Sequence, residues 1–378
     1  MRWEMTSMIQ RVDLKAQYLV YRDEVSSAVM RVLDSGKYTL GPEVGSFEAE
    51  FSKFIGVQET IGVADGTRAI SMALQVLGVK LGDEVITTAF TAVPTIGAIL
   101  EVGATPVFAD IDPDTYLLDI ESIVAKVSNK TRAIVPVHMF GNVFDIPALR
   151  TRLPRAIPIV EDAAQAHGSD LRGAKAGTMG DLATFSFYPT KNLGGYGDGG
   201  AITTNNTDYA KRLRVIRNHG MINKDICDEP GVNSRLDEMQ AAILRVKLPH
   251  LEAMNAARAA RAEQYMRGLP ADLFRHQKVT PGGRNNWHVF QSRYLGDRDG
   301  LVAHLDAVGV QSNIYYVVPH HLQPAFANLG YKEGDLPNVE LVCRQAVALP
   351  MYPELPAETT RKVIEAINAY KPLVAKRA

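Results

Sequence analysis

A carboxylate and a lysine each follow a short apolar run in the middle of the chain. Asp162 comes after the run Ile157–Glu161, and Lys191 comes shortly after the run Ala183–Phe187. If both runs are strands of an open α/β sheet, both side chains lie at its carboxyl edge, where such folds bind ligands. An amine that can form an imine and a carboxylate that can hold a positive charge on a pyridine nitrogen are what pyridoxal 5'-phosphate needs from a protein. The pattern therefore predicts Lys191 and Asp162 as catalytic residues, against the alternatives of a solvated loop lysine and a helix N-cap.

A glycine and a threonine mark a second candidate binding point. Gly66-Thr67 stands between a predicted strand, Thr60–Ala64, and a predicted helix, Thr67–Leu77. At such a turn the first amides of the helix have no intrahelical acceptor, and glycine lets a ligand approach them closely. Considered alone, the pair is better explained as an ordinary turn. Together with Lys191, it favours a phosphate site.

The elements that must position these residues alternate between short apolar runs and helical stretches from about Thr60 onward. Runs of Val, Ile and Ala without strict alternation suit strands buried on both faces, so we expect an α/β fold with a mostly parallel sheet covered by helices. The predicted strands are Thr60–Ala64, Glu84–Thr88, Pro106–Ala109, Ala133–Val137, Ile157–Glu161, Ala183–Phe187 and Gly200–Thr204. The predicted helices between them are Thr67–Leu77, Pro94–Val102, Ile120–Lys126 and Tyr209–Arg217.

The pattern changes after about Leu236. A long helical stretch, Asp237 to about Gly268, precedes two strand-like runs, His288–Tyr294 and Gln311–Tyr316, and a final amphipathic helix, Glu358–Leu373. We therefore predict a large N-terminal domain over residues 1–245 and a smaller C-terminal α+β domain over residues 246–378. An early helix, Tyr21–Leu33, is expected to pack against the rest of the molecule.

Composition excludes several classes of function. The 378 residues include 41 Lys and Arg against 42 Asp and Glu, a net charge of −1 with no basic stripe, which argues against a nucleic-acid binder. The two cysteines, Cys227 and Cys343, are far apart, and neither they nor the histidines are spaced as metal ligands, so no metal is expected. The polar start of the chain and the interrupted apolar stretch near Val93–Val107 predict neither a signal peptide nor a membrane span. A cytoplasmic enzyme is the resulting expectation.

Several motifs in fixed order resemble the DegT/DnrJ/StrS family of nucleotide-sugar aminotransferases, which have the fold of type I pyridoxal-phosphate enzymes. The motifs are Val12–Lys15 (VDLK), Gly62–Leu74 (GVADGTRAISMAL), Val137-His138, Glu161–Gly168, Ser186–Lys191, Gly231–Ala242 (GVNSRLDEMQAA) and Leu349–Tyr352 (LPMY). One such motif alone would be weak, but together they span nearly the whole chain. The resemblance implies pyridoxal 5'-phosphate as cofactor, a nucleotide-sugar substrate and an amino-acid donor, usually glutamate.

The resemblance also implies roles for individual cofactor-binding residues. Gln165 would face the phenolic oxygen of the ring, and Ser186 would join Gly66 and Thr67 at the phosphate. Phe90 would stack on the ring, with core packing as its alternative. Asn233 would reach the cofactor phosphate of a neighbouring subunit, which makes the predicted form a homodimer with shared active sites. The alternative for Asn233 is the start of a helix.

Substrate contacts are expected from a looser set of residues, and the reaction has alternatives. The candidate substrate-binding residues are Tyr188, Arg235, His219, Tyr315 and His321. The strings Tyr188–Gly200 and Gly231–Asp237 resemble family members that aminate carbon 3 of a keto-sugar linked to dTDP or UDP, as in the biosynthesis of lipopolysaccharide O-antigens or natural products. Many such members have His-Tyr-Pro where this chain has Tyr315-Tyr316-Val317. Amination at carbon 4 and a non-catalytic cofactor-binding regulator are the alternatives, while Lys191 argues against the dehydratases of the family, which carry histidine there.

Overall fold

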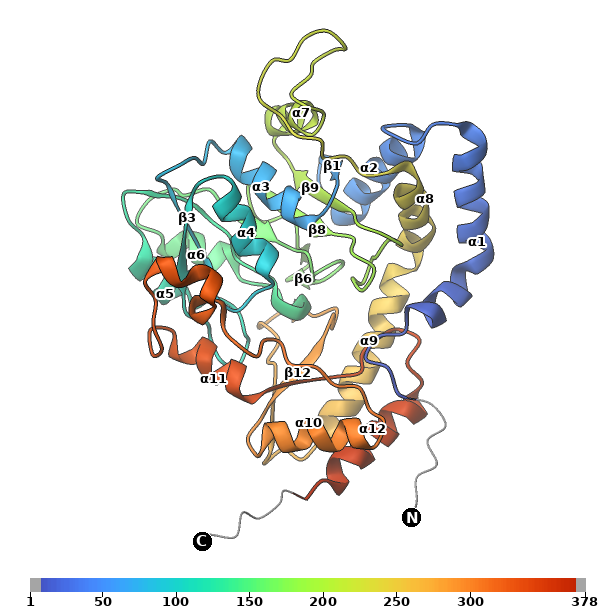
Figure 1. The fold of residues 1–378 in the computed structure, drawn as a ribbon, viewed down its shortest axis with the longest axis vertical. Helices are drawn as coiled ribbons and strands as arrows, with labels where there is room; N and C mark the ends of the chain where they lie inside the picture. Colours follow the sequence, from blue (N-terminus) through green and yellow to red (C-terminus); the bar gives the residue numbers. More distant parts are fainter. Residues whose placement is uncertain (1–7, 372–378) are drawn as a thin grey trace.

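The computed structural model describes residues 8–371 and centres on a twisted sheet between two layers of helices (Figure 1). Four strands pair in the order β1 (Glu59–Val63), β9 (Gly200–Thr204), β8 (Leu182–Ser186) and β5 (Val160–Asp162). Three more pair in the order β3 (Thr105–Ala109), β2 (Glu84–Thr88) and β4 (Thr131–Ile134). Parallel bridges from Ile134 to Ile159 and from Val137 to Asp162 join the two groups into one continuous sheet.

The sheet is parallel except at β9, which runs antiparallel to both β1 and β8. The prediction of a mostly parallel α/β sheet is therefore confirmed, with each predicted strand of this sheet present and shifted by a few residues at most. Because β9 runs antiparallel to β8, the loop between them begins and ends at the same edge of the sheet. Ser186 and Gly200, the residues on either side of that loop, are paired.

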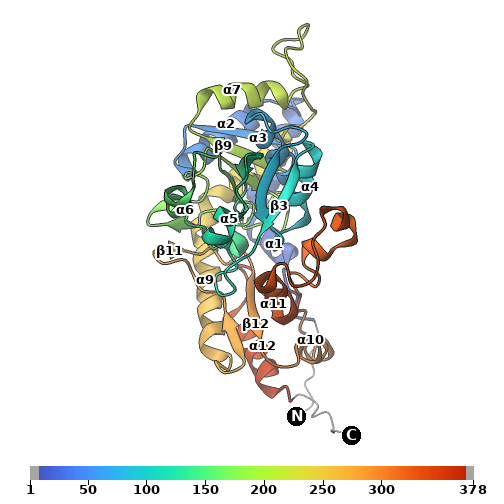
Figure 2. The ribbon, with the colours of Figure 1, turned by 90° about the vertical axis from the view of Figure 1, so that its left-hand side faces the viewer.

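Helices cover both faces of the sheet, because neighbouring residues of each strand point to opposite sides. Val85 packs into one apolar cluster and Ile86 into another. One face carries α3 (Gly66–Val76), α4 (Val93–Glu101) and α7 (Thr207–Ile216). The other face carries α2 (Pro42–Ile55), α5 (Ile120–Lys126), α6 (Ile146–Arg152) and α8 (Glu238–Lys247). Figure 2 shows α4 and α6 on opposite sides of the sheet.

The N-terminal helix α1 (Leu14–Ser35) lies against α8 and is longer than predicted. Its buried residues Tyr21, Val25, Ala28 and Val32 recur every three or four positions, which gives one apolar face. The Asp13 side chain accepts a hydrogen bond from the amide of Ala16 at 2.9 Å, and the helix begins about two turns before the predicted start.

The C-terminal part is built on a small antiparallel sheet. Its strands are β10 (Phe274–His276), β12 (Phe290–Tyr294) and β13 (Ala346–Leu349), and its helices are α9 (Leu251–Gly268), α10 (Arg298–Ala307), α11 (Pro337–Gln345) and α12 (Ala357–Ala369). The predicted stretch from Asp237 to Gly268 is interrupted by a short 3-10 turn, Leu248–His250, because Pro249 has no amide to continue the α-helical ladder. The predicted final residue of the last helix, Leu373, lies outside the described residues.

Shorter elements complete the description. They are the two-residue strands β6 (Asp170–Leu171), β7 (Ala174–Lys175) and β11 (Gly283–Arg284) and the 3-10 turns Met139–Gly141, His320–Leu322 and Pro324–Leu329. Through β11 and β6 the C-terminal part pairs with the large sheet region. Within residues 8–371, no helix is both long and apolar enough to cross a bilayer.

One predicted strand, Gln311–Tyr316, is absent. The segment makes a single bridge, from Asn313 to Ala348, and then turns. The domain boundary at residues 245 and 246 stays a prediction: α9 contributes Leu251 and Met254 to the core under the large sheet and Ala262 and Tyr265 to the C-terminal core.

Candidate active site

A cavity of about 800 Å³ opens where β5 and β8 end and where α3 and α4 begin. Seven residues predicted from the sequence line it, namely Gly66, Thr67, Asp162, Gln165, Ser186, Tyr188 and Lys191. They come from three separate loops that the sheet brings to one edge. The predicted meeting of the carboxylate and the lysine at this edge is therefore confirmed.

Lys191 lies on the loop between β8 and β9. Its amide donates to the carbonyl of Tyr188 at 2.8 Å, which forms a tight turn directly after the strand. The next residue, Asn192, is buried, and its side-chain hydrogen bonds hold this turn in place. Its side-chain amide donates to Asn255 Oδ1 at 2.8 Å and to the carbonyl of Asn286 at 3.0 Å, and its Oδ1 lies 3.1 Å from Nδ1 of His288.

Two of these partners also hold the neighbouring loop after β5. Asn255 donates to the carbonyl of His167 at 2.9 Å, and Asn286 donates to the carbonyls of Gln165 and His167 at 3.0 and 3.1 Å. We call Asn192, Asn255 and Asn286 the amide network. It fixes the loops that carry Asp162 and Lys191 relative to each other, from residues of the C-terminal part.

Burial lowers the pKa of Lys191 to about 8, although the negative charge of Asp162 acts in the opposite direction. At pH 7 about one such lysine in ten is a neutral amine, against about one in three thousand at the ordinary value. The nearby His167 is neutral, because burial first and the charge of Lys191 second lower its pKa to about 3. The site therefore keeps its amine reactive near neutral pH.

Asp162 is buried and held by two hydrogen bonds that leave room for a third partner. Its Oδ2 accepts from the hydroxyl of Thr95 at 2.8 Å, and its Oδ1 accepts from the amide of Ala164 at 3.2 Å. Thr95 in turn lies 2.8 Å from the hydroxyl of Thr91. Each carboxylate oxygen keeps a free acceptor site, which suits a protonated ring nitrogen in the cavity.

Gln165 is held by the backbone so that its amide group remains available. Its Oε1 accepts from the amide of Phe140 at 2.9 Å. An amide NH₂ group can donate to a phenolic oxygen, as predicted for this residue.

The first turn of α3 and the end of β8 form a cradle of hydrogen-bond donors. The Asp65 side chain accepts from the amide of Arg68 at 2.9 Å, so this carboxylate serves as the N-cap, while helix geometry leaves the amides of Gly66 and Thr67 free. The Ser186 oxygen accepts from the amide of Tyr188 at 3.3 Å, and its O–H remains free to donate. This donor set fits a phosphate group.

The cradle leaves no space for a side chain at residue 66. A Cβ at this position would lie 2.8 Å from Cβ of Ser186. We expect Gly66→Ala to weaken cofactor binding by about 10- to 100-fold, because either the helix or the serine must move. Gly97→Ala is the matched control: Gly97 also lines the cavity, in α4, but a Cβ there would meet nothing within 4 Å. Equilibrium dialysis against pyridoxal 5'-phosphate measures both, and equal affinities for the two variants would contradict the cradle.

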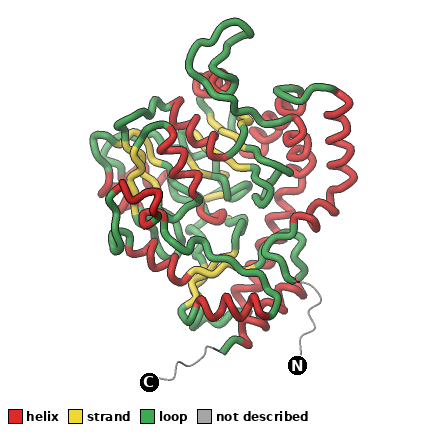
Figure 3. Tube along the Cα trace, in the orientation of Figure 1, coloured by secondary structure: helices red, strands yellow, loops and turns green. Residues whose placement is uncertain are grey.

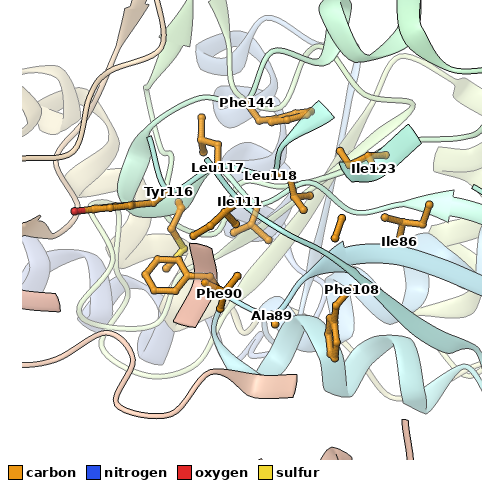
Figure 4. Packing of buried hydrophobic residues seen from close by; sticks show 14 of the residues in the cluster. Ile86, Ala89, Phe90, Phe108, Ile111, Tyr116, Leu117, Leu118, Ile123 and Phe144 are labelled. Atoms are coloured by element: carbon orange, nitrogen blue, oxygen red, sulfur yellow. The ribbon is translucent and has the colours of Figure 1, made fainter. Parts of the chain in front are cut away.

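Three predicted residues do not reach the cavity in this structure. Phe90 is fully buried in an apolar cluster together with Tyr116 (Figure 4). Its ring packs against those of Tyr116 and Phe140. His321 is buried, and its Nε2 lies 3.1 Å from a carboxylate oxygen of Glu340. The Tyr315 ring packs on Phe140, and its backbone pairs with Gln291. Core packing, the alternative for Phe90, is what the structure shows; His321 and Tyr315 do not line the cavity, and their substrate contacts stay predictions.

Three further predicted residues, His219, Asn233 and Arg235, lie on the long loop after α7, which projects from the molecule (Figure 3). Asn233 and His219 are exposed, and none of the three lines the cavity of its own chain. Arg235 donates to Oδ1 of Asn218 at 3.0 Å. Their predicted contributions to the site therefore stay predictions.

Sequence reasoning missed Thr95 and Asn192, which orient Asp162 and the Lys191 loop. Thr95 stands beside Pro94 at the start of a predicted helix, a position that also suits an ordinary N-terminal turn. Asn192 directly follows the predicted catalytic lysine, and this adjacency was the one available signal.

Comparisons with known proteins agree with this geometry. A family model described as the DegT/DnrJ/EryC1/StrS aminotransferase family matches residues 20–368. The chain is 44% identical to the "Pleiotropic regulatory protein" of Geobacillus stearothermophilus, over 96% of this chain and 98% of that protein. It is 43% identical to the "dTDP-3-amino-3,4,6-trideoxy-alpha-D-glucose transaminase" of Streptomyces venezuelae, over 97% of each chain. The crystal structure of S. venezuelae DesV "in complex with ketimine intermediate" is 43% identical, with a TM-score of 0.93 over 96% of this chain and 98% of that chain.

Proposed function

Because the chain belongs to the DegT/DnrJ/EryC1/StrS aminotransferase family, whose cofactor is pyridoxal 5'-phosphate, we propose that it aminates carbon 3 of a nucleotide-linked keto-hexose. The amino donor in this proposal is glutamate, and the nucleotide is dTDP or UDP. The observation that carries the proposal is Lys191, a lysine of lowered pKa in a cavity with Asp162 and a cradle of phosphate donors. The preference for carbon 3 is supported by the name of the 43% identical S. venezuelae relative.

The residues of the cavity fit the cofactor and divide its chemistry among them. When bound, the cofactor supplies an aldehyde and a ring that accepts electrons. Gly66, Thr67 and Ser186 would hold its phosphate, and the Asp162 carboxylate would keep the ring nitrogen protonated. Nζ of Lys191, as a neutral amine, would take a proton from one reacting carbon and return it to the other.

Product analysis tests the proposal directly. The purified enzyme is incubated with glutamate and either a 3-keto or a 4-keto dTDP-hexose, and the products are examined by mass spectrometry and NMR. We expect an amino group at carbon 3. A product aminated at carbon 4 alone would reject amination at carbon 3 and identify the enzyme as a 4-keto-sugar aminotransferase.

A regulator that binds the cofactor without turnover is the second candidate, favoured by the 44% identical relative named "Pleiotropic regulatory protein". The lowered pKa of Lys191, which makes the neutral amine accessible near pH 7, argues for turnover. Spectra of the cofactor-loaded protein separate the two candidates, because an aminotransferase converts its cofactor to the pyridoxamine form when an amino donor is added. A spectrum that never changes with any amino acid would favour the regulator.

We further propose a homodimer in which Asn233 of one subunit completes the site of the other. Its support is the exposed position of Asn233 on the loop after α7, away from its own cavity. Lys191→Ala and Asn233→Ala homodimers should both be impaired. Unfolding and refolding them in an equal mixture should restore about a quarter of wild-type activity, since half of the dimers then contain one intact site of two. No recovery on mixing, with dimers seen by sedimentation, would show that each site uses one chain.

Location and pathway complete the proposal. Both cysteines, Cys227 and Cys343, are free, as is usual in a reducing compartment such as the cytoplasm. The amino sugar would enter glycan synthesis, of the lipopolysaccharide O-antigen type, or natural-product synthesis. Identifying the sugar in the product assay tests this assignment.

A further inference from the structure

The charges around the cavity do not match the substrates of the proposed function. Of the described residues that line it, four are acidic, namely Asp65, Glu101, Asp162 and Asp198, and two are basic, Arg68 and Lys191. A nucleotide diphosphate and a dicarboxylic amino acid are both anions, and Lys191 is committed to the cofactor. Among the described residues that line the cavity, Arg68 is therefore the cation that remains for an anionic substrate group.

Arg68 is placed where such a group would arrive. It follows Gly66 and Thr67 in the first turn of α3, so its side chain starts beside the phosphate cradle and lines the cavity. Its guanidinium is paired with the carboxylate of Glu101, the last residue of α4. The helices α3 and α4 lie side by side (Figure 1), and the pair spans them at the cavity.

The ion pair can be exchanged at little cost. Both side chains are well exposed, 40% for Arg68 and 36% for Glu101, and an exposed pair of this kind contributes little to stability. A guanidinium offers a planar fork that binds a carboxylate or a phosphate equally well. The Glu101 carboxylate thus occupies, in this structure, the place that a substrate anion could take.

We propose that Arg68 binds an anionic oxygen group of the substrate, a carboxylate of the amino donor or the diphosphate of the nucleotide, in exchange for Glu101. This inference rests on the proposed function, since it assigns the substrate contact within that site. Glu101 acts as an internal competitor that holds the guanidinium at the cavity until an anion displaces it.

Three variants of the cofactor-loaded enzyme test the exchange. Binding is measured by calorimetry with glutarate, an unreactive dicarboxylate, and with UDP and dTDP. Arg68→Gln should weaken the binding of either glutarate or the nucleotides by about tenfold or more, and the affected probe identifies the source of the anion. Glu101→Gln should strengthen binding of the same probe by a few-fold, about the worth of an exposed pair. Arg68→Lys, which keeps the charge but loses the fork, should fall between wild type and Arg68→Gln.

A matched pair elsewhere controls for general effects of charge. Arg152 and Glu121 form another exposed ion pair, at 2.8 Å, between α6 and α5, and neither lines the cavity. Arg152→Gln should leave both affinities unchanged. If Arg68→Gln binds glutarate, UDP and dTDP as the wild type does, the inference is wrong. Because these measurements need no turnover, they remain decisive even if the wild-type enzyme fails to aminate a keto-sugar, an outcome that would reject the proposed function alone.

Discussion

Replacement of Lys191 by arginine is expected to reduce transamination by about 10⁴-fold or more and to remove the visible absorbance of the covalently attached cofactor. Arginine keeps the positive charge and nearly the length of the side chain. Its guanidinium stays protonated at any pH that the protein tolerates, so it can neither attack an aldehyde nor carry a proton between two carbons. Wild-type Lys191, with its pKa lowered to about 8, can do both. Steady-state rates and the absorption spectrum of the purified variant measure the effect.

The control for this prediction is a lysine-to-arginine change outside the site. Lys211 on α7 is exposed and pairs with Asp208, so Lys211→Arg should show wild-type turnover and spectrum. Thermal unfolding of both variants verifies that the fold is kept. Turnover of Lys191→Arg at the wild-type rate would overturn the assignment of the catalytic amine.

Replacement of Asp162 by asparagine is the second large effect we expect, a loss of about 10²- to 10⁴-fold in kcat. The buried carboxylate would stabilise a proton on the ring nitrogen, and breaking a buried charge pair costs about 3–5 kcal/mol. Asparagine is nearly isosteric and can still bond Thr95 and Ala164, so the fold should survive. Single-turnover rates with glutamate report the loss separately from sugar binding.

The matched comparison is Thr95→Val, which keeps the charge of Asp162 and removes one of its two hydrogen bonds. One hydrogen bond to a charged group contributes about 1.5–3 kcal/mol, so the kcat of this variant should fall by about 10- to 100-fold. A larger loss for Thr95→Val than for Asp162→Asn would mean that the carboxylate acts through its geometry rather than its charge.

The sequence allowed the central sheet and the chemistry at its edge to be predicted, because both follow from local patterns. Glu84–Thr88 and Gly200–Thr204 are strands with the predicted bounds, since each is a short apolar run bounded by turn residues. Asp162 and Lys191 meet because parallel strands end at a common edge, which requires no knowledge of the packing.

The remaining features depend on contacts between residues far apart in the chain. The direction of β9 is set by its pairing with β1 and β8 and leaves no mark on its own composition. Gln311–Tyr316 has the residues of a strand, but it makes only one bridge to β13 and was predicted wrongly. From the sequence, His321 could bind a substrate or pack in the core. Its contact with Glu340, which the sequence does not reveal, shows that it is part of the core.

The amide network also determines how the molecule comes apart. Asn255 and Asn286 belong to the C-terminal part, yet their hydrogen bonds go to Asn192, Gln165 and His167 under the large sheet. If either part opened first, these hydrogen bonds would break and the other part would lose them as well, which is costly. We therefore expect the two parts to melt in a single cooperative transition, so that a ligand bound at the sheet edge also slows hydrogen exchange in helix α9 of the C-terminal part.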